Sequence, residues 1–340
     1  MAASVLLVAV AALALSAFLT RTVLRRARSG GLIDVPNQRS SHQLPTPTGG
    51  GTSIVIAATV GFMALFALGA IDVQLLAAAS GGLLVAVAGF IDDRRRLSAR
   101  VRIVVHTLAA LWALFWLGGL HALRFDHFLW TPHAFGYVLG VLGVVWTINL
   151  FNFMDGIDGL AVSEAIFMAG AAALLGASAG AAAAPLRADL LFAAACAGFA
   201  LWNWPPARIF MGDVGSGYVG YLLAILALSA ARDSEVALLV WLTLGGVFFV
   251  DATVTLTRRC LRGERVYEAH RSHAYQWLAR RWGSHRRTTV TMLLVNVAWL
   301  LPCAGFETAF PQYAARITLL ALAPLTVLAF GAGAGRSEAG

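Results

Sequence analysis

The 340-residue sequence contains no lysine, only three cysteines and few charged residues of either sign. All 25 basic residues are arginines, so the chain has no side-chain amine for Schiff-base chemistry and every strong cation is a permanently charged guanidinium. The cysteines, Cys196, Cys260 and Cys303, lie far apart without Cys-X-X-Cys spacing. This pattern supports neither a disulfide framework nor a zinc-binding cysteine cluster.

Charged residues make up 12% of the chain and hydrophobic residues 59%, and the mean hydropathy is +0.76. A soluble domain is typically about half apolar and about a quarter charged. The apolar excess is too large for one water-soluble core, and the aromatic content of 10% argues against a disordered chain. Apolar runs approach the roughly 20 residues that cross a bilayer as a helix. The composition therefore predicts an all-α polytopic membrane protein.

About eleven apolar segments are predicted to be transmembrane helices, with ten as the alternative count. The first has arginines after it and none before it, which predicts an uncleaved first span with its N-terminus outside rather than a signal peptide. No linker, low-complexity tract or clear repeat interrupts the chain, so residues 1–340 are expected to form a single domain integral to the lipid bilayer. The predicted spans are residues 3–20, 50–70, 73–91, 102–120, 134–151, 160–180, 187–203, 215–231, 235–257, 288–306 and 313–333.

The arginines are distributed unequally between the loops. Alternation of the spans places 21 of the 25 arginines on one side. Because positively charged loops remain in the cytosol, that side is predicted to be cytosolic. The same bias explains the pI of about 10.2 without a nucleic-acid partner. The predicted cytosolic segments are residues 21–49, 92–101, 152–159, 204–214, 258–287 and the C-terminal tail.

Acidic residues gather on the same side. An ionised aspartate at the bilayer centre costs about 3 kcal/mol on insertion scales, so carboxylates beside apolar spans need a reason. Five lie at predicted cytosolic span ends, whereas the acids of the opposite side are scattered singly in loops. This contrast indicates a functional site at the cytosolic membrane edge. The five residues are Asp92, Asp93, Asp155, Asp158 and Asp213.

The first acidic motif, GFIDDRRR, contains Asp92 and Asp93 followed by three arginines. The arginines could neutralise a charged stop at the end of a span. Adjacent acids beside phosphate-binding arginines also suit a divalent metal and a polyphosphate. The motif alone leaves these two interpretations open.

In the second motif, NLFNFMDGIDGLA, oxygen-bearing side chains recur every three residues, so each neighbours the next on a helical surface. Gly156 and Gly159 are expected to open the helix. Helix capping explains one of these polar residues, and the set favours a hard-cation or ribose and base site. The four residues are Asn149, Asn152, Asp155 and Asp158.

The third motif, RIFMGDVGSGYVGY, places Asp213 before a run of small residues and a new apolar span. Ser216 is expected to be the N-cap of that span. The flanking glycines would let backbone N–H groups approach an anion at the positive helix end. An acid within such a glycine run favours a site that holds Mg²⁺ and phosphate together.

Two further cytosolic loops contain candidate ligands. In IDVPNQRSSHQLPTPTGGG, Arg39 and His42 could reach a phosphate or sugar, or the segment could be an ordinary solvated loop. The loop over 258–287 combines aromatics with nine arginines, which suits an interfacial segment that binds anionic lipid. Its His270 and His273 could instead share one face of a ligand site.

Taken in order, the five cytosolic segments resemble the polyprenyl-phosphate N-acetylhexosamine-1-phosphate transferases, of the glycosyltransferase family 4 type. The resemblance covers roughly residues 30–290. The HRSHAYQ segment differs from the HxHH-type cluster of the peptidoglycan and enterobacterial common-antigen enzymes. It is more similar to transferases that initiate O-antigen on N-acetylated 6-deoxyhexosamines. The matching pieces are DVPNQRSSHQLPTPTGGG, GFIDD, NLFNFMDGIDGL, FMGDVGSGYVG and HRSHAYQ.

The resemblance implies an enzyme of the bacterial inner (cytoplasmic) membrane whose active site faces the cytosol. Membrane polyprenyl (undecaprenyl) phosphate would attack the sugar-linked phosphorus of a UDP-N-acetylhexosamine. The products would be polyprenyl-diphospho-sugar and UMP, which initiates a cell-surface polysaccharide such as the O-antigen of lipopolysaccharide. A homodimer is compatible with this interpretation.

The resemblance also assigns residues. Mg²⁺, with Mn²⁺ as the alternative, would be held by Asp213 and Asp155. Asp158 and the backbone at Gly156 would meet the uracil, and Phe210 would stack on it. The other polar residues of these motifs are predicted to bind substrate: Arg39, His42, Asn149, Asn152 and Ser216.

Asp92 is the family's proposed general base for the lipid phosphate, and Asp93 a metal or positioning group. A phosphate monoester has a second pKa near 6 and is mostly dianionic at neutral pH. We therefore expect orientation and charge balance by this pair to matter more than proton removal. His270, Arg271 and His273 would grip the diphosphate or sugar, because arginine can make a bidentate phosphate contact.

The alternative function is a secondary transporter or channel, which also uses membrane acids and broken helices. Its acids would be expected near the bilayer midplane, and its sequence often shows two repeats. A phosphotransferase for CDP-activated alcohols would carry a DGxxAR-type helix motif, which the chain lacks.

A geometric argument favours the lipid substrate. A polyprenyl chain cannot leave the bilayer and a UDP-sugar cannot enter it, so their phosphates can meet only at the cytosolic membrane edge, where these acids are predicted to lie.

Overall fold

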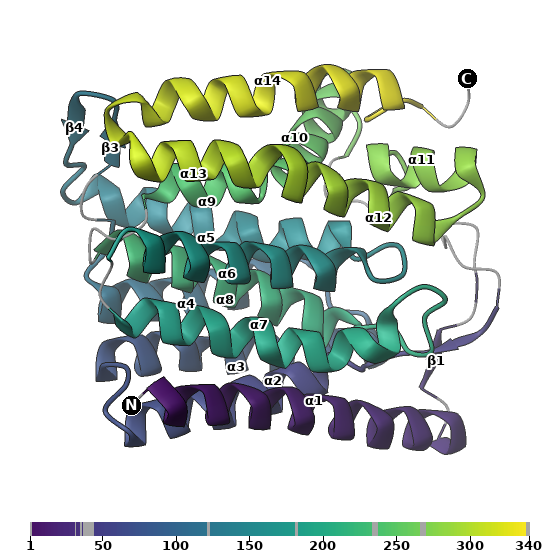
Figure 1. Cartoon of the computed structure of the whole chain (residues 1–340). Coiled ribbons are helices and arrows are strands. Elements are labelled where there is room, and N and C mark those ends of the chain that lie inside the picture. The colour runs from purple at the N-terminus through teal and green to yellow at the C-terminus, as the bar shows by residue number, and fades with distance from the viewer. Residues whose placement is uncertain are drawn as a thin grey trace.

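The computed structural model describes residues 2–30, 32–34, 36, 44–120, 123–180, 183–232, 237–265 and 270–337. Its long helices lie side by side along one common direction, α10 crosses them, and the few strands are confined to the two ends of the bundle (Figure 1). The predicted all-α polytopic membrane fold is confirmed. Among the described residues, nine helices are long and apolar enough to cross a membrane.

These nine helices correspond to nine of the predicted spans. One of the nine is a long helix made of two α-helical parts, α12 and α13, joined by the π-helical turn η1. They are α1 (Ala2–Gly30), α3 (Val73–Arg95), α4 (Ala99–Leu117), α5 (Phe135–Met154), α6 (Leu160–Ser178), α7 (Ala183–Asn203), α8 (Asp213–Arg232), α12–η1–α13 (His285–Val295, Asn296–Leu300, Leu301–Ala309) and α14 (Ala314–Ala332).

Two predicted spans differ from a straight membrane helix. The segment 50–70 forms the shorter α2 (Thr52–Ala67). The segment 235–257 is divided into α9 (Leu238–Leu244) and α10 (Gly246–Leu261), which meet at an angle of 79°. The break falls at Gly245 and Gly246, where the lack of side chains weakens the helix. Counting this pair as one span gives ten crossing segments in the described residues.

Helix α8 occupies the centre of the bundle. Every residue from Val214 to Ala230 is buried. Its glycines permit close packing, because a Cβ at Gly220 would lie 2.5 Å from the carbonyl oxygen of Thr147 on α5. The position of the N-terminus of α8 is therefore determined by the helices around it.

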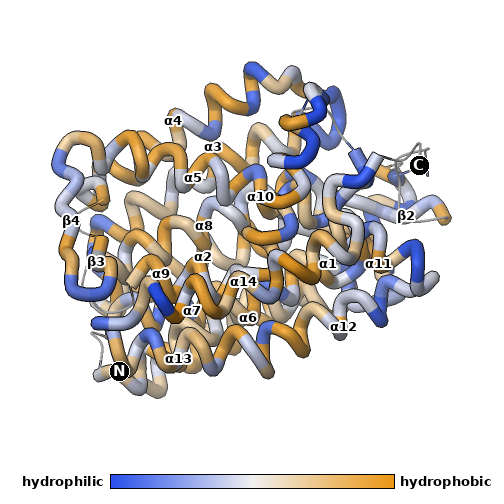
Figure 2. The backbone as a smooth tube through the Cα atoms, turned by 90° about the horizontal axis from the view of Figure 1, so that it is seen from above, coloured by the Kyte–Doolittle hydropathy of each residue, from blue (hydrophilic) through white to orange (hydrophobic). Residues whose placement is uncertain are grey.

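The outer helices present large apolar side chains outward. Leu7 of α1, Phe115 of α4 and Leu319 of α14 are each about 70% exposed, which is what a lipid-facing surface requires. The tube coloured by hydropathy is largely hydrophobic along the helices, and hydrophilic residues collect toward the ends (Figure 2).

One end of the bundle contains β1 (Ile33–Asp34), β2 (Thr46–Pro47) and α11 (Ala274–Trp282). The chain after α14 returns to this end, where the Gly335 N–H donates to the Ser272 carbonyl at 2.7 Å. The N-terminus of α1 lies at the opposite end (Figure 1). We call the end with α11 the motif end, because the acidic motifs reach it. The opposite end contains β3 (Leu123–Phe125), β4 (Phe128–Trp130) and the 3₁₀-helix η2 (Pro311–Tyr313).

Candidate active site

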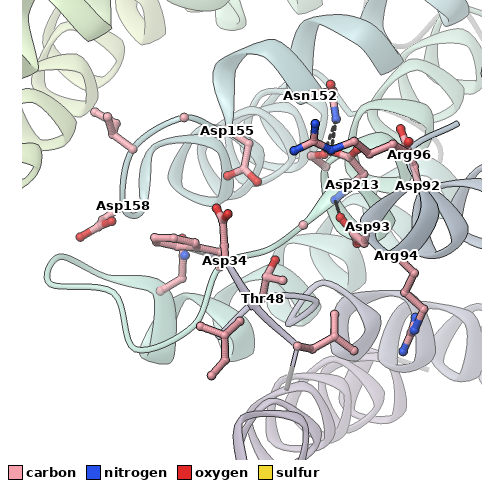
Figure 3. Close-up of a pocket in the computed structure, with 18 of the residues that line it drawn as sticks. Asp34, Thr48, Asp92, Asp93, Arg94, Arg96, Asn152, Asp155, Asp158 and Asp213 are labelled. Atoms are coloured by element: carbon pink, nitrogen blue, oxygen red, sulfur yellow. Dashed lines mark hydrogen bonds between the residues drawn. The ribbon is translucent and has the colours of Figure 1, made fainter. Parts of the chain in front are cut away.

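A cavity of about 840 Å³ opens at the motif end, and we call it the acidic cavity. The five aspartates predicted from the motifs line it together, and Asp34 of β1 joins them. Three arginines, Arg94, Arg96 and Arg102, lie in the same wall. Residues that are far apart in sequence thus face one space, with several carboxylates pointing toward its centre (Figure 3).

Asp93 and Asp213 join the ends of two helices. Asp93, near the end of α3, accepts hydrogen bonds from the backbone N–H groups of Asp213 (2.8 Å) and Val214 (3.2 Å). A carboxylate at this position satisfies unpaired donors at a helix N-terminus and interacts favourably with the helix dipole. Helix α8 consequently begins at Asp213, three residues before Ser216. The predicted N-cap role of Ser216 is therefore wrong, because Asp93 supplies the cap.

Close backbone approach makes this arrangement possible. A Cβ at Gly89 would lie 2.3 Å from the Asp213 carbonyl oxygen, so α3 meets the start of α8 with no room for a side chain. Gly212 has a φ of 75°, which favours glycine, and a Cβ there would lie 2.7 Å from the Asp93 carboxylate.

Asn152 lies on α5 and links that helix to α8. Its side-chain amide donates to the Asp213 Oδ1 at 2.7 Å and to the Ser216 Oγ at 3.2 Å. Asn149, one turn earlier, donates instead to the Val145 carbonyl and lines a small adjoining cavity. Of the four polar residues in this motif, the structure places Asn152 and the two aspartates in the wall of the acidic cavity.

Asp155 is the C-cap residue of α5, and Gly159, with φ of 72°, is the N-cap residue of α6. The predicted opening of the helix at these glycines is confirmed. Burial raises the pKa of Asp155 well above its usual range, and the nearby carboxylates of Asp213, Asp93 and Asp158 raise it further. A cation in the acidic cavity would relieve this repulsion.

Asp158 lies where the acidic cavity meets a second space of about 710 Å³. Its carboxylate accepts a hydrogen bond from the Ala207 N–H at 3.0 Å and lies 3.2 Å from the His285 Nδ1. Phe210 and Gln276 line both spaces as well. The two spaces together could hold an extended ligand.

Asp92 is engaged in the turn between α3 and α4. One carboxylate oxygen accepts the Leu97 N–H, and the other lies 3.3 Å from the Arg102 guanidinium. Only 8% of the Asp92 side chain is exposed. Because both oxygens have partners, the geometry suits orientation and charge balance better than proton abstraction.

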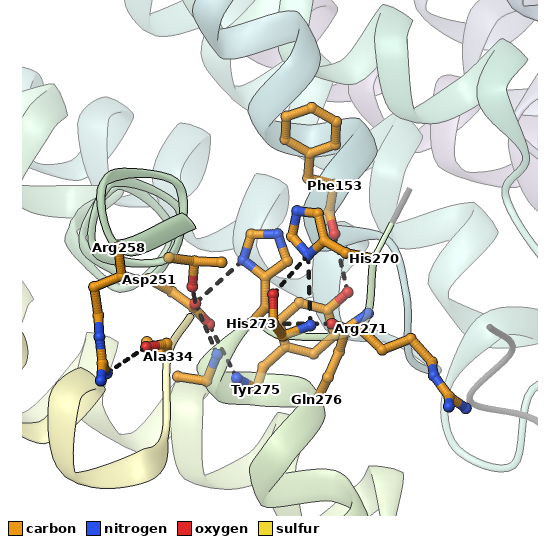
Figure 4. A network of polar contacts seen from close by, with 12 residues as sticks. Phe153, Asp251, Arg258, His270, Arg271, His273, Tyr275, Gln276 and Ala334 are labelled. Atoms are coloured by element: carbon orange, nitrogen blue, oxygen red, sulfur yellow. Dashed lines mark hydrogen bonds and ion pairs between the residues drawn. The ribbon is translucent and has the colours of Figure 1, made fainter. Parts of the chain in front are cut away.

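The predicted histidine and arginine ligands lie apart from this wall. His270 stacks on His273 with ring centroids 4.8 Å apart, and neither residue lines the acidic cavity, nor does Arg271. His273 is buried, with its Nδ1 3.2 Å from the Asp251 carboxylate (Figure 4). Arg39 and His42 lie outside the described residues.

Several cavity residues were not predicted from the sequence. Asp34 opens the DVPN motif, so its type and position were available as a clue, but its direction depends on the pairing of Asp34 with Thr46 between β1 and β2. His285 reaches Asp158 from a helix more than a hundred positions later. The polar side chains among these residues are Asp34, Thr48, Arg102, Asn203, Gln276 and His285.

The donor set of the acidic cavity fits a hard divalent cation. Within the described ranges, no three His, Cys, Asp or Glu side chains form a ready-made metal cage. Mg²⁺ does not require one, because it is usually bound by one or two carboxylates together with waters and substrate phosphates. Asp155 and Asp213 can supply these carboxylates, and the carboxylates gathered around Asp155 favour a cation there.

Comparison with known proteins supports one family. Residues 75–231 match the model of the family described as "Glycosyl transferase family 4". The chain is 28% identical over 289 residues to a probable undecaprenyl-phosphate N-acetylglucosaminyl 1-phosphate transferase of Bacillus subtilis, covering 82% of this chain and 78% of the relative. It is 29% identical to the undecaprenyl-phosphate alpha-N-acetylglucosaminyl 1-phosphate transferase of Yersinia pestis, covering 88% and 83%.

A phospho-N-acetylmuramoyl-pentapeptide-transferase of Shouchella clausii is also 29% identical, with 77% of this chain and 84% of the relative covered. The names of these relatives differ in the sugar that is transferred. Several of the names specify a polyprenyl phosphate, either undecaprenyl or decaprenyl phosphate. In its motifs, its family match and its relatives, the chain is similar to the polyprenyl-phosphate hexosamine-1-phosphate transferases, and these findings together support that family.

Proposed function

We propose that the protein transfers N-acetylhexosamine-1-phosphate from a UDP-sugar to undecaprenyl phosphate and forms undecaprenyl-diphospho-sugar and UMP. The observation that carries this proposal is the acidic cavity at the ends of the membrane helices, where carboxylates from four separate stretches of chain meet. A soluble nucleotide and a membrane-bound phosphate can both reach this position.

In the proposed reaction, an oxygen of the lipid phosphate attacks the sugar-linked phosphorus, and the bond from that phosphorus to the UMP oxygen breaks. No proton transfer is needed at the attacking oxygen, because the phosphate monoester is mostly dianionic at neutral pH. This agrees with the engaged carboxylate of Asp92, whose partners are Leu97 and Arg102.

Asp213 and Asp155 would hold Mg²⁺ or Mn²⁺, which when bound neutralises charge on the diphosphate and the leaving UMP. Asn152 orients Asp213 through its 2.7 Å hydrogen bond. Asp93 holds the start of α8 in register with α3. These contacts supply the positioning on which phosphoryl transfer depends.

The two ends of the site suit different parts of the substrates. Asp158 and Phe210 would bind the nucleoside, beside the second space that they also line. At the other side, Arg94, Arg96 and Arg102 provide guanidinium groups that can bind phosphate in a bidentate manner. We assign this arginine side to the acceptor phosphate.

We further propose that the protein lies in the bacterial inner membrane with the acidic cavity toward the cytosol. The arginine distribution supports this orientation, and the relatives are bacterial proteins. Initiation of a surface polysaccharide such as O-antigen follows from the similarity of HRSHAYQ to that subgroup. The transporter alternative is disfavoured, because these acids lie at one end of the spans rather than at their middle.

The test uses purified protein in undecaprenyl-phosphate-containing vesicles and a panel of UDP-N-acetylhexosamines. We expect UMP release and lipid-linked product with at least one sugar, and neither product when the lipid phosphate is omitted. Solute flux without UMP release would favour the transporter, and the absence of lipid-linked product with every sugar would contradict the proposed activity.

A further inference from the structure

The HRSHAYQ segment is tied to the rest of the protein by one buried carboxylate. Asp251 lies on α10 and is 3% exposed. It accepts hydrogen bonds from the backbone N–H groups of Ala274 (2.8 Å) and Tyr275 (3.0 Å), and it lies 3.2 Å from the His273 Nδ1. It therefore caps the first turn of α11 (Figure 4).

The capped turn in turn contacts the end of α5. The Tyr275 hydroxyl donates to the carbonyl oxygen of Phe153 at 2.9 Å, and the Tyr275 side chain is fully buried. A Cβ at Gly156 would lie only 2.1 Å from the same hydroxyl oxygen. Phe153 and Gly156 stand on either side of Asp155, so the hydroxyl touches the chain before and after that carboxylate.

The next residue of α11 reaches the acidic cavity itself. Gln276 lines its wall, and its side-chain oxygen accepts the His273 N–H at 3.2 Å. Asp251, His273 and Tyr275 do not line that wall. They therefore form a support behind the cavity rather than a surface that substrate touches.

We propose that Asp251 and Tyr275 are positioning residues, which hold the turn at Asp155 in place through the N-terminus of α11. The expected effect on catalysis rests on the proposed function. The contacts of Asp251 and Tyr275 are a property of the fold and do not depend on that function. A displacement of about 1 Å at a catalytic group can reduce a rate by about 100-fold. Loss of a contact behind Asp155 should therefore lower turnover, although Asp251 and Tyr275 do not contact the substrate.

The first experiment is Tyr275→Phe, which retains the ring and removes the hydroxyl. We expect kcat to fall by at least about 10-fold, while KM for the UDP-sugar changes by less than about 3-fold. Amide hydrogen exchange in residues 150–160 should become faster, which reports on the turn independently of activity.

The second experiment exploits the close approach at Gly156. Gly156→Ala alone should reduce kcat strongly, because its methyl group collides with the Tyr275 hydroxyl. Combining it with Tyr275→Phe removes the colliding atom, so the double variant should be at least about 5-fold more active than Gly156→Ala, a coupling that two independent sites would not show. Absence of this recovery would contradict the inference.

Asp251→Asn tests the cap, and Glu307→Gln is its matched control. Glu307 is likewise a buried carboxylate, accepts hydrogen bonds from Thr243 and Thr318, and lies on α13 away from the cavity. Only the Asp251 variant should lower kcat and speed exchange in residues 150–160. If Asp251→Asn does not fold, the Tyr275 and Gly156 variants decide the question.

The outcomes separate the two proposals. Wild-type protein that transfers no sugar phosphate contradicts the proposed function alone. Unchanged exchange in residues 150–160 of the folded Tyr275→Phe protein contradicts the positioning role alone.

Discussion

The side-chain amide of Asn152 donates to the carboxylate of Asp213 across a distance of 2.7 Å, joining the end of α5 to the beginning of α8. The two residues are 61 positions apart. Asn152 thus fixes one oxygen of Asp213 in the wall of the acidic cavity. Asp93 fixes the backbone of the same residue from α3.

Removal of the Asn152 amide should impair transfer. A hydrogen bond to a charged group contributes about 1.5–3 kcal/mol, so Asn152→Ala should lower kcat/KM by about 10- to 100-fold. The measurement is the steady-state release of UMP. Asn149→Ala is the comparison, and its loss should be clearly smaller, because Asn149 bonds to the Val145 carbonyl instead. Equal losses would argue against the assigned role of Asn152.

Divalent cations should be required for transfer, and the requirement should depend on Asp213. Chelation should abolish UMP release from the wild-type protein, and added Mg²⁺ should restore it. Asp213→Asn should reduce turnover by at least about 100-fold at any Mg²⁺ concentration, because one of the two proposed carboxylate ligands is lost. Size-exclusion chromatography and thermal unfolding check that this variant is folded. Wild-type turnover in it would remove the metal assignment.

The contact between α3 and α8 should tolerate no added side chain. Gly89→Ala would place a methyl carbon 2.3 Å from the backbone of Asp213. We expect destabilisation of about 1–3 kcal/mol from this overpacking, together with loss of activity. Gly170→Ala on α6 is the matched control, because a Cβ there meets nothing within 4 Å. If thermal unfolding shows equal stability for the two variants, the tight contact is not present in solution.

A natural cysteine can report the orientation in the membrane. Cys260 is exposed at the end of α10, whereas Cys196 is buried and Cys303 is partly buried. A membrane-impermeant thiol reagent should label Cys260 in inverted inner-membrane vesicles and not in intact spheroplasts. Cys260→Ser identifies the labelled site. Labelling in intact spheroplasts would place the acidic cavity outside the cytosol.

The membrane architecture was accessible from the sequence because hydrophobic runs have the length of the bilayer and arginines mark their ends. Each of the eleven predicted segments is helical over most of its described residues. The bend between α9 and α10 was not predicted, since hydropathy continues unbroken through Gly245 and Gly246. A helix break there depends on packing, such as the 2.6 Å approach of a Cβ at Gly246 to Leu322.

The site was predicted as far as its residue types were unusual. Aspartates beside apolar spans stand out, and those predicted line one cavity. The cap of α8 was assigned to Ser216 because sequence rules look for a neighbour along the chain, whereas Asp93 comes from another helix. For the same reason Asp251, which sits within a span, was not recognised as the partner of α11.

Helix α8 is enclosed by the other helices, since every residue from Val214 to Ala230 is buried. Bilayers that differ in thickness or acyl composition therefore act on the outer helices, such as α1 and α14, and not directly on α8. The height of Asp213 relative to the water boundary is consequently insulated from the membrane in which the protein resides. A transferase of this construction should keep its turnover nearly constant across lipids that alter the tilt of its peripheral helices.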